Sequence, residues 1–188
     1  VNTMKNRYSD NLHFVQFDIN STALTQIVTA VNEAGLTGFA NHLNAADKDF
    51  LSGKYDIIWD GRAMVSLLGA FAGIFFAESV QKGFSMLNEK TGTKIASEKV
   101  TLRDDALLKG GYGTQPFDSE GVSGKNKEVI ENGVLKTLLY NRKTAKKDGV
   151  ASTGNGFKAG LTGSVKTATT NFYLAKGGIS QEELFAQM

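Results

Sequence analysis

The sequence has no cysteine, and histidine occurs only as His13 and His42. Without cysteine there can be no disulfide bond, no thiolate metal site and no cysteine nucleophile. Neither histidine has a second possible ligand three or four residues further along the chain, whereas a zinc site needs three or four clustered donors. The residues by themselves therefore predict no metal site, and we interpret both histidines as structural or surface residues.

Long runs of like charge and long hydrophobic segments are also missing. The 21 lysines and arginines and the 19 aspartates and glutamates are interspersed and give a net charge of +2, which argues against a nucleic-acid-binding tail. The longest apolar stretch, Ala63–Ala77, is shorter than the about 20 residues of a membrane-spanning helix. No signal-peptide pattern is seen at the start. We expect no nucleic acid and no membrane among the partners.

A long helical pattern runs from Arg62 to about Asn88. Its first half is apolar nearly all round, which predicts a long helix that is buried on most sides. Gly69, Gly73 and Gly83 interrupt this pattern, and each costs a helix about 1 kcal/mol relative to alanine. We expect the close approach of another backbone to compensate for that cost.

The rest of the sequence predicts mainly strands. Proline occurs only as Pro116 whereas glycine occurs 21 times, so glycine supplies the backbone freedom needed at turns and helix ends. Asn132-Gly133 is a hairpin signal, since both positions of such a turn need positive φ. Ser180 with Glu183 forms the pattern of a capping box at the start of a last helix. The other expected elements are the strand Leu12–Ile19, the helix Ser21–Ala34, the loop Thr37–Gly53 and the strands Tyr55–Trp59, Lys94–Leu102, Lys127–Ile130, Val134–Tyr140 and Val165–Leu174.

This order of elements predicts an α+β fold with a mainly antiparallel sheet. The 188 residues suffice for one domain, or for one domain and a fragment of another. The chain starts at Val1 and ends at Met188 in a helical pattern without a cap, so we expect a piece of a longer protein.

Two pairs of carboxylates are the strongest chemical candidates, Asp104 with Asp105 and Asp118 with Glu120. The second pair lies in the tight loop Pro116–Gly121 and is able to act as general acid and base. Such acids more often cap turns by accepting backbone N–H bonds, and we favour that interpretation. No phosphate-binding loop and no nucleophile elbow is present. The residues alone reveal no active site.

Several short segments occur in a specific order and spacing: Gly83–Ser85, Val100–Asp105, Pro116–Val122, Val129–Lys136, Ser152–Gly156 and Thr170–Tyr173. Taken together, these segments resemble the TldD/PmbA family, and the resemblance extends from Tyr55 to the end. Members of this family are called modulators of DNA gyrase and are understood as cytoplasmic peptidases.

The resemblance also implies which of the two family subunits this chain is similar to. The TldD kind binds zinc through a helical His-Glu-x-x-x-His motif and a later cysteine, and it pairs with the PmbA kind, also called TldE. Counting back from Gly83 places the three motif positions on Leu68, Gly69 and Gly73, whose side chains offer no lone pair to a metal. The chain thus resembles the PmbA/TldE kind, which implies no catalytic residue and no metal here, with zinc on a TldD-like partner.

Fold and domains follow from the same resemblance. Residues 1–53 correspond to the tail end of a preceding region, with a strand, a helix and a loop. Residues 54–188 correspond to most of a C-terminal β-rich domain with a barrel-like sheet, truncated at its end.

The implied function is that of a subunit in a heterodimeric zinc metallopeptidase that cleaves or matures peptides in the cytoplasm. In this hypothesis the chain completes a peptide-holding cavity, and extended peptides add as a strand to a sheet edge. Two alternatives are a self-sufficient homodimeric metallopeptidase and a protein-binding modulator of DNA gyrase. The loops Gln115–Gly121 and Ser152–Gly156 supply the candidate peptide-binding residues, which are Asp118, Glu120, Gly121, Thr153, Gly154 and Asn155.

Overall fold

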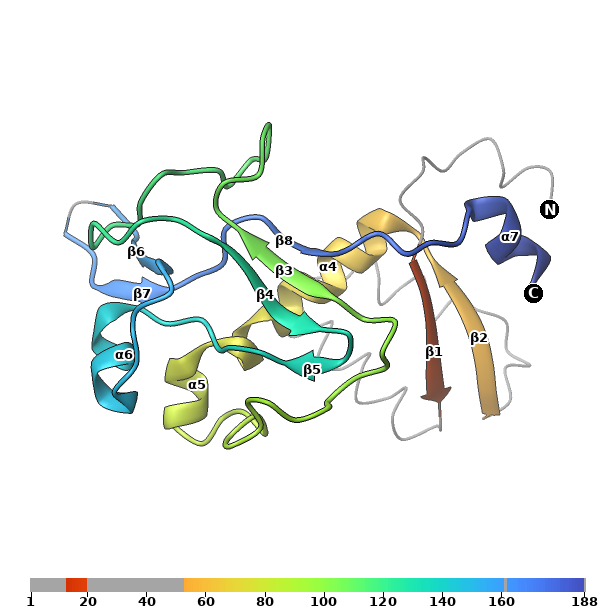
Figure 1. The fold of residues 1–188 in the computed structure, drawn as a ribbon, viewed down its shortest axis with the longest axis horizontal. Coiled ribbons are helices and arrows are strands. Elements are labelled where there is room, and N and C mark those ends of the chain that lie inside the picture. The colour runs from red at the N-terminus through yellow and green to blue at the C-terminus, as the bar shows by residue number, and fades with distance from the viewer. Residues whose placement is uncertain (1–12, 20–52, 161, 188) are drawn as a thin grey trace. The chain divides into compact units, whose positions relative to one another are not determined.

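The computed structural model describes residues 13–19, 53–160 and 162–187 (Figure 1). The helix expected over Ser21–Ala34 and nearly all of the loop Thr37–Gly53 lie outside these residues. The chain divides into two compact units, and each is described by itself. One unit consists of Val1–Ala70 with Lys176–Met188, and the other consists of Phe71–Ala175.

The first unit contains an antiparallel strand pair and two helices. Strand β1 (His13–Ile19) pairs with β2 (Gly53–Trp59), with His13 opposite Trp59 and Ile19 opposite Gly53, so both predicted strands are confirmed. Helix α7 (Gln181–Ala186) begins at Ser180, whose hydroxyl accepts from Glu183 N at 3.2 Å while the Glu183 carboxylate accepts from Ser180 N at 2.8 Å. The predicted capping box is therefore confirmed.

The single long helix expected from Arg62 to about Asn88 is wrong. Helix α4 (Gly61–Phe71) is followed by the 3₁₀ turn η1 (Ala72–Phe75) and then by the short helix α5 (Ala77–Gln81). The break lies at the extended residue Phe76, because the backbone on both sides of it pairs with Leu139: Leu139 N donates to Phe75 O at 2.8 Å, and Ala77 N donates to Leu139 O at 3.0 Å. Bonds to a distant segment thus replace the helical ladder.

Burial of this region also differs from the expectation. Met64 is the one buried residue of α4, so that helix is not enclosed on most sides by the described residues. A Cβ atom added at Gly69 or Gly73 would meet no heavy atom of the described residues within 4 Å, so no backbone that the structure describes makes the close approach expected at these glycines. Gly83 has φ +77° and follows the last turn of α5, where glycine commonly ends a helix.

The second unit is built around a four-stranded antiparallel sheet in the order β5-β4-β3-β8. Its strands are β3 (Leu102–Asp105), β4 (Asn126–Glu131), β5 (Val134–Leu135) and β8 (Phe172–Leu174). A separate antiparallel pair is formed by β6 (Gly156–Lys158) and β7 (Val165–Thr167), and helix α6 (Arg142–Asp148) precedes it.

The predicted α+β class with antiparallel sheets is confirmed, but the barrel-like closure is not. Among the described strands, β5 and β8 remain the two edges of an open sheet. A barrel requires each edge to find a partner over a sufficient length, and β5 has 2 residues while β8 has 3. Side chains of β3, β4 and β5 fill the interior, and the rings of Phe75 and Phe172 lie 6.0 Å apart.

The predicted hairpin is confirmed at Asn132-Gly133, where φ is +47° and +80°. The strand expected over Lys94–Leu102 is wrong apart from its last residue. This segment instead wraps the hairpin turn: Ile95 N and Ala96 N donate to Gly133 O at 2.8 and 3.1 Å, and Gly133 N donates to Val100 O at 2.9 Å. Three bonds to one turn residue leave the segment irregular.

The strand expected over Val165–Leu174 is divided into β7 and β8, which belong to different sheets. The chain leaves its extended course at Thr170, whose backbone N–H donates to the Asp104 carboxylate at 2.6 Å.

Across the parts of the chain that the structure describes, we find no helix whose length and hydrophobicity would suit a bilayer crossing.

Candidate functional site

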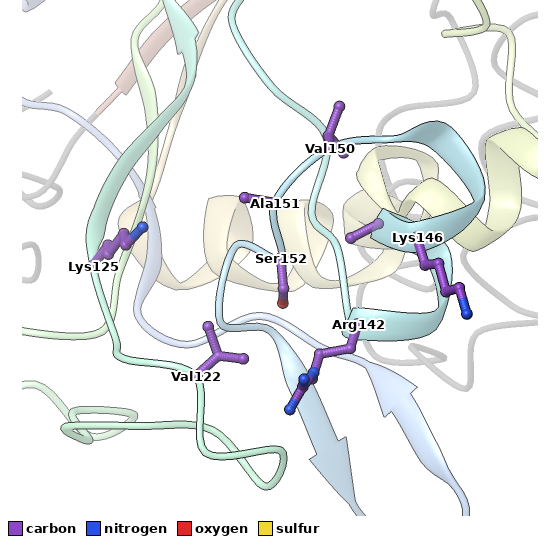
Figure 2. Close-up of a pocket in the computed structure, with 8 residues that line it drawn as sticks. Val122, Lys125, Arg142, Lys146, Val150, Ala151 and Ser152 are labelled. Carbon is purple, nitrogen blue, oxygen red and sulfur yellow. The ribbon is translucent and has the colours of Figure 1, made fainter.

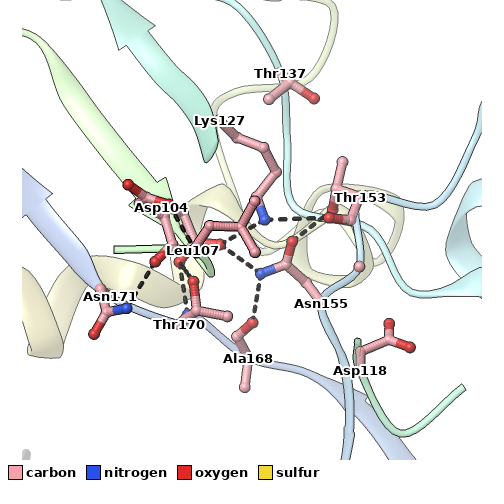
Figure 3. A network of polar contacts seen from close by, with 12 residues as sticks. Asp104, Leu107, Asp118, Lys127, Thr137, Thr153, Asn155, Ala168, Thr170 and Asn171 are labelled. Carbon is pink, nitrogen blue, oxygen red and sulfur yellow. Dashed lines mark hydrogen bonds and ion pairs between the residues drawn. The ribbon is translucent and has the colours of Figure 1, made fainter. Parts of the chain in front are cut away.

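A buried ion pair joins two strands of the second unit. Asp104 on β3 is fully buried, and its Oδ2 lies 3.1 Å from the Lys127 Nζ on β4, whose side chain is 8% exposed (Figure 3). The pair comes from neighbouring strands, since Asp104 stands opposite Lys127 in the register of β3 and β4. A charge in this position needs both its partner and further hydrogen bonds to offset desolvation.

The loop Ser152–Gly156 supplies part of those bonds. Asn155, also fully buried, donates from Nδ2 to Asp104 Oδ2 at 2.7 Å and to Ala168 O at 2.9 Å. Its Oδ1 accepts from Thr153 Oγ1 at 2.7 Å, and Lys127 Nζ donates to Thr153 O at 3.2 Å. The ion pair therefore fixes this loop to the sheet.

The other oxygen of Asp104 holds the segment before β8. Oδ1 accepts from Thr170 N at 2.6 Å and from Thr170 Oγ1 at 3.0 Å. Next to it, Asn171 donates to Asp105 O at 2.7 Å and accepts from Gly113 N at 2.8 Å. Both oxygens of the buried carboxylate are thus engaged, and this network positions loops without offering a free acid or base.

The loop Pro116–Val122 is held in a similar way around Asp118, which is 3% exposed. Its Oδ1 accepts from Glu120 N and Val122 N, both at 2.9 Å, and its Oδ2 accepts from Gly156 N at 2.9 Å. These are the bonds of a turn cap, as the sequence analysis favoured. They also tie this loop to Gly156, so the two predicted loops lie against one another.

The remaining candidates shape the contact between these loops. Glu120 Oε2 accepts from Arg142 N at 2.7 Å. Gly121 and Gly154 have φ of +73° and +76°, and a Cβ atom at Gly154 would lie 2.8 Å from Ser123 O. The structure brings all six predicted residues into one region, where the described contacts of their polar groups are internal to the chain.

A hollow of about 420 Å³ opens beside these loops and α6 (Figure 2). The sequence did not predict this hollow, because helix α6, which forms one side of it, has no apolar periodicity. The signals for the two ends of α6 are nevertheless present in the sequence: Asn141 caps its start through Thr144, and Gly149 ends it with φ +68°. The lining residues are Val122, Lys125, Arg142, Ala145, Lys146, Val150, Ala151 and Ser152.

Tyr140, just before α6, and Arg103, on β3, both have raised pKa values. Burial, followed by the nearby Asp148 carboxylate, raises the pKa of Tyr140, whose hydroxyl donates to Asp148 Oδ2 at 3.3 Å. The Glu128 carboxylate, 2.9 Å from the guanidinium, raises the pKa of Arg103. Both shifts stabilise the protonated forms, so neither group becomes a base near neutral pH.

The positions that the family resemblance assigns to zinc ligands do not suit a metal. Leu68 and Gly69 lie in α4, and Gly73 lies in η1. Hydrocarbon and glycine side chains provide no donor for zinc. Within residues 13–19, 53–160 and 162–187, no group of three or more His, Cys, Asp or Glu could hold a metal ion. The residues that the structure describes therefore do not fit the ion.

Comparisons with known proteins identify relatives over most of the chain. Residues 52–188 match the family model described as the PmbA/TldA metallopeptidase C-terminal domain. A metalloprotease of Methanocaldococcus jannaschii is 38% identical over 133 residues, which are 70% of this chain and 29% of that protein. Further relatives carry names of both kinds, TldD homolog and PmbA.

Two solved structures are also similar. A protein of Thermotoga maritima described as a modulator of a DNA gyrase has 40% identity and a TM-score of 0.59, covering 66% of this chain and 28% of that one. TldE from Thermococcus kodakarensis has 31% identity and a TM-score of 0.57, covering 62% and 26%. The chain thus spans less than a third of the length of these relatives.

Proposed function

Since this chain belongs to the PmbA/TldD metallopeptidase family, we propose that it acts as a PmbA/TldE-like, non-catalytic subunit of a heterodimeric metallopeptidase. Its partner is a TldD-like subunit that carries the zinc, and the pair cleaves or matures peptides in the cytoplasm. Residues 1–53 represent the end of a preceding region, and residues 54–188 represent most of the C-terminal domain.

The observation that carries this proposal is the chemistry of Leu68, Gly69 and Gly73. A metallopeptidase needs a metal-bound water and a carboxylate that activates it, and these three side chains supply neither. Open space around Gly69 and Gly73 means that internal packing of the described residues does not demand glycine there. Larger side chains with metal-binding atoms would fit at Gly69 and Gly73 among the described residues, so crowding does not explain why such atoms are missing there.

The proposed contribution of this chain is to help hold the peptide. The ion pair of Asp104 with Lys127 and the cap formed by Asp118 give the loops Gln115–Gly121 and Ser152–Gly156 a defined shape. Such preorganisation lowers the entropic cost of binding. Asp118, Glu120, Gly121, Thr153, Gly154 and Asn155 act by shaping the peptide-facing surface, and the sheet edges allow strand addition.

The test uses this chain with a family member that carries His-Glu-x-x-x-His from the same genome. The two chains are expected to co-purify, and the pair is expected to cleave unfolded peptides in a chelator-sensitive way. This chain alone is expected to show neither cleavage nor bound zinc. As a control, replacing the motif glutamate of the partner by glutamine should abolish cleavage without separating the subunits.

A second candidate is a metallopeptidase that acts without a different partner, favoured by the TldD-type names among the relatives. Metal analysis separates the two functions. About one zinc per chain, together with chelator-sensitive cleavage by the purified chain alone, would establish the second candidate and reject the non-catalytic role.

A further inference from the structure

Three of the eight residues that line the hollow beside α6 are cations. Lys125 lies on one side of it, and Arg142 and Lys146, both on α6, lie on the other (Figure 2). The remaining lining is Ser152 and four apolar side chains, Val122, Ala145, Val150 and Ala151. No carboxylate contributes to the lining, so the hollow presents positive charge next to an apolar surface.

In the part of the chain that the structure describes, Lys125, Arg142 and Lys146 are not among the cations that form ion pairs. The ion pairs found in the described part of the chain involve Lys82, Lys94, Arg103, Lys127 and Lys136. The nearby carboxylate of Glu120 accepts from the backbone N–H of Arg142 and forms no ion pair with its guanidinium. The charges of Lys125, Arg142 and Lys146 therefore remain available to a ligand.

The spacing on α6 is unfavourable for an isolated helix. Arg142 and Lys146 are four residues apart, as are Lys143 and Lys147, and like charges at this spacing repel one another. Elsewhere the same spacing joins opposite charges, as in Glu78 with Lys82. A bound anion would relieve the repulsion between Arg142 and Lys146.

From this arrangement we infer that the hollow binds a carboxylate of a peptide, next to an apolar side chain of the same peptide. Arginine and lysine form charge-assisted hydrogen bonds with carboxylates, and the four apolar residues suit a hydrocarbon neighbour. The volume of about 420 Å³ falls within the ~300–1,000 Å³ of common small-ligand sites. The inference rests on the proposed function in taking the ligand to be a peptide.

The same features argue against a nucleic acid. Single-stranded nucleic acids are bound by a long basic groove with aromatic side chains on which bases stack. None of the lining residues is aromatic, and only three are cations. The site therefore matches one carboxylate and its neighbour better than a row of phosphates.

The experiment measures the anisotropy of fluorescein-labelled peptides titrated with the full chain. Three peptides share one apolar sequence: one has a glutamate and an amidated C-terminus, one has glutamine and a free C-terminus, and one has glutamine and an amidated C-terminus. The first two distinguish a side-chain carboxylate from a terminal one. We expect at least one of them to bind about tenfold more tightly than the third.

The test variant is Arg142→Gln/Lys146→Gln, and the matched control is Lys143→Gln/Lys147→Gln. Both remove the same charge from the same helix, but only the first pair lines the hollow. We expect the test variant to bind the carboxylate peptide about tenfold more weakly and the control to change by less than about twofold. Circular dichroism and urea unfolding verify that both variants fold.

Each other outcome has a distinct meaning. Equal weakening by both variants would overturn the inference in favour of diffuse surface charge. Equal binding of all three peptides would overturn the carboxylate preference while leaving the peptide-holding role intact. Tighter binding of a phosphopeptide or of single-stranded DNA than of the carboxylate peptides would also overturn it. If no peptide binds to this chain while the heterodimer still cleaves peptides, the inferred carboxylate site would be overturned and the proposed heterodimeric function would stand.

Discussion

Replacing Lys127 by methionine tests whether the buried ion pair organises the second unit. Methionine retains most of the aliphatic length of lysine but removes its charge. The Asp104 carboxylate would keep its three hydrogen bonds from Asn155 and Thr170, while its ion-pair partner at 3.1 Å would be lost. Thr153 O would lose a donor as well.

The expected loss of stability is large because the side chains of Asp104 and Lys127 are buried, at 0% and 8% exposure. Removing one partner of such a pair costs about 3–5 kcal/mol, since the other charge remains buried and uncompensated. With a urea dependence of about 2 kcal/mol per molar, the unfolding midpoint should fall by roughly 2 M. The free energy of unfolding is measured by urea titration followed by circular dichroism.

Lys136→Met is the matched control, because Lys136 pairs with Glu131 at a similar distance of 3.2 Å but with side chains 50% and 40% exposed. Solvent screens such a pair, so its midpoint should stay essentially unchanged. In a double-mutant cycle, Asp104→Asn combined with Lys127→Met should cost less than the sum of the single losses. Equal midpoints for the two methionine variants, or strict additivity in the cycle, would refute the reasoning.

Three further predictions concern glycine, tyrosine and the capped loop. Gly69→Ala should raise the free energy of unfolding by up to about 1 kcal/mol, since the site is helical and open. Gly133→Ala should lower the free energy of unfolding by about 2 kcal/mol or more, because φ is +80° and the added Cβ would overlap two carbonyl oxygens. The pKa of Tyr140 is raised by burial and by Asp148. The contribution of Tyr140 to stability is therefore complete below the ordinary tyrosine pKa of about 10 and is lost as pH rises through the raised value. Tyr140→Phe should flatten the decline of the urea midpoint at alkaline pH, and an unchanged decline would contradict this. Asp118→Asn should cost about 1–3 kcal/mol in urea unfolding, because an N–H group would face backbone donors, and an unchanged midpoint would show that the cap is dispensable.

Local features of the fold were predictable where a short segment carries its own conformational requirement. Asn132-Gly133 forms the hairpin turn because both residues adopt positive φ. Ser180 and Glu183 cap α7 because their side chains reach each other's backbone N–H groups within one turn. Such bonds depend on neighbours in sequence, so they can be recognised before any tertiary contact is known.

The candidate site was predictable only in part, because its polar side chains find distant partners. Asp104 was recognised as a carboxylate near Asp105, but its partner Lys127 and its contacts with Asn155 and Thr170 follow from strand register and loop packing. Asp118 was recognised as a turn cap, whereas its bond to Gly156 links two loops far apart along the chain. Arg142 and Lys146 were not selected, because nothing local distinguishes them from other surface cations.

By itself the sequence determined the α+β class, the turn and cap chemistry, and the ordered motifs that indicate the family, because each depends on residues close together in the chain. Only the tertiary structure decided that the long apolar helix breaks at Phe76, since the backbone beside it pairs with Leu139. The tertiary structure also places Lys125 and residues of α6 around the same hollow. Long-range hydrogen bonds and packing outweigh local preference at these places, and local preference is what a pattern of residues records.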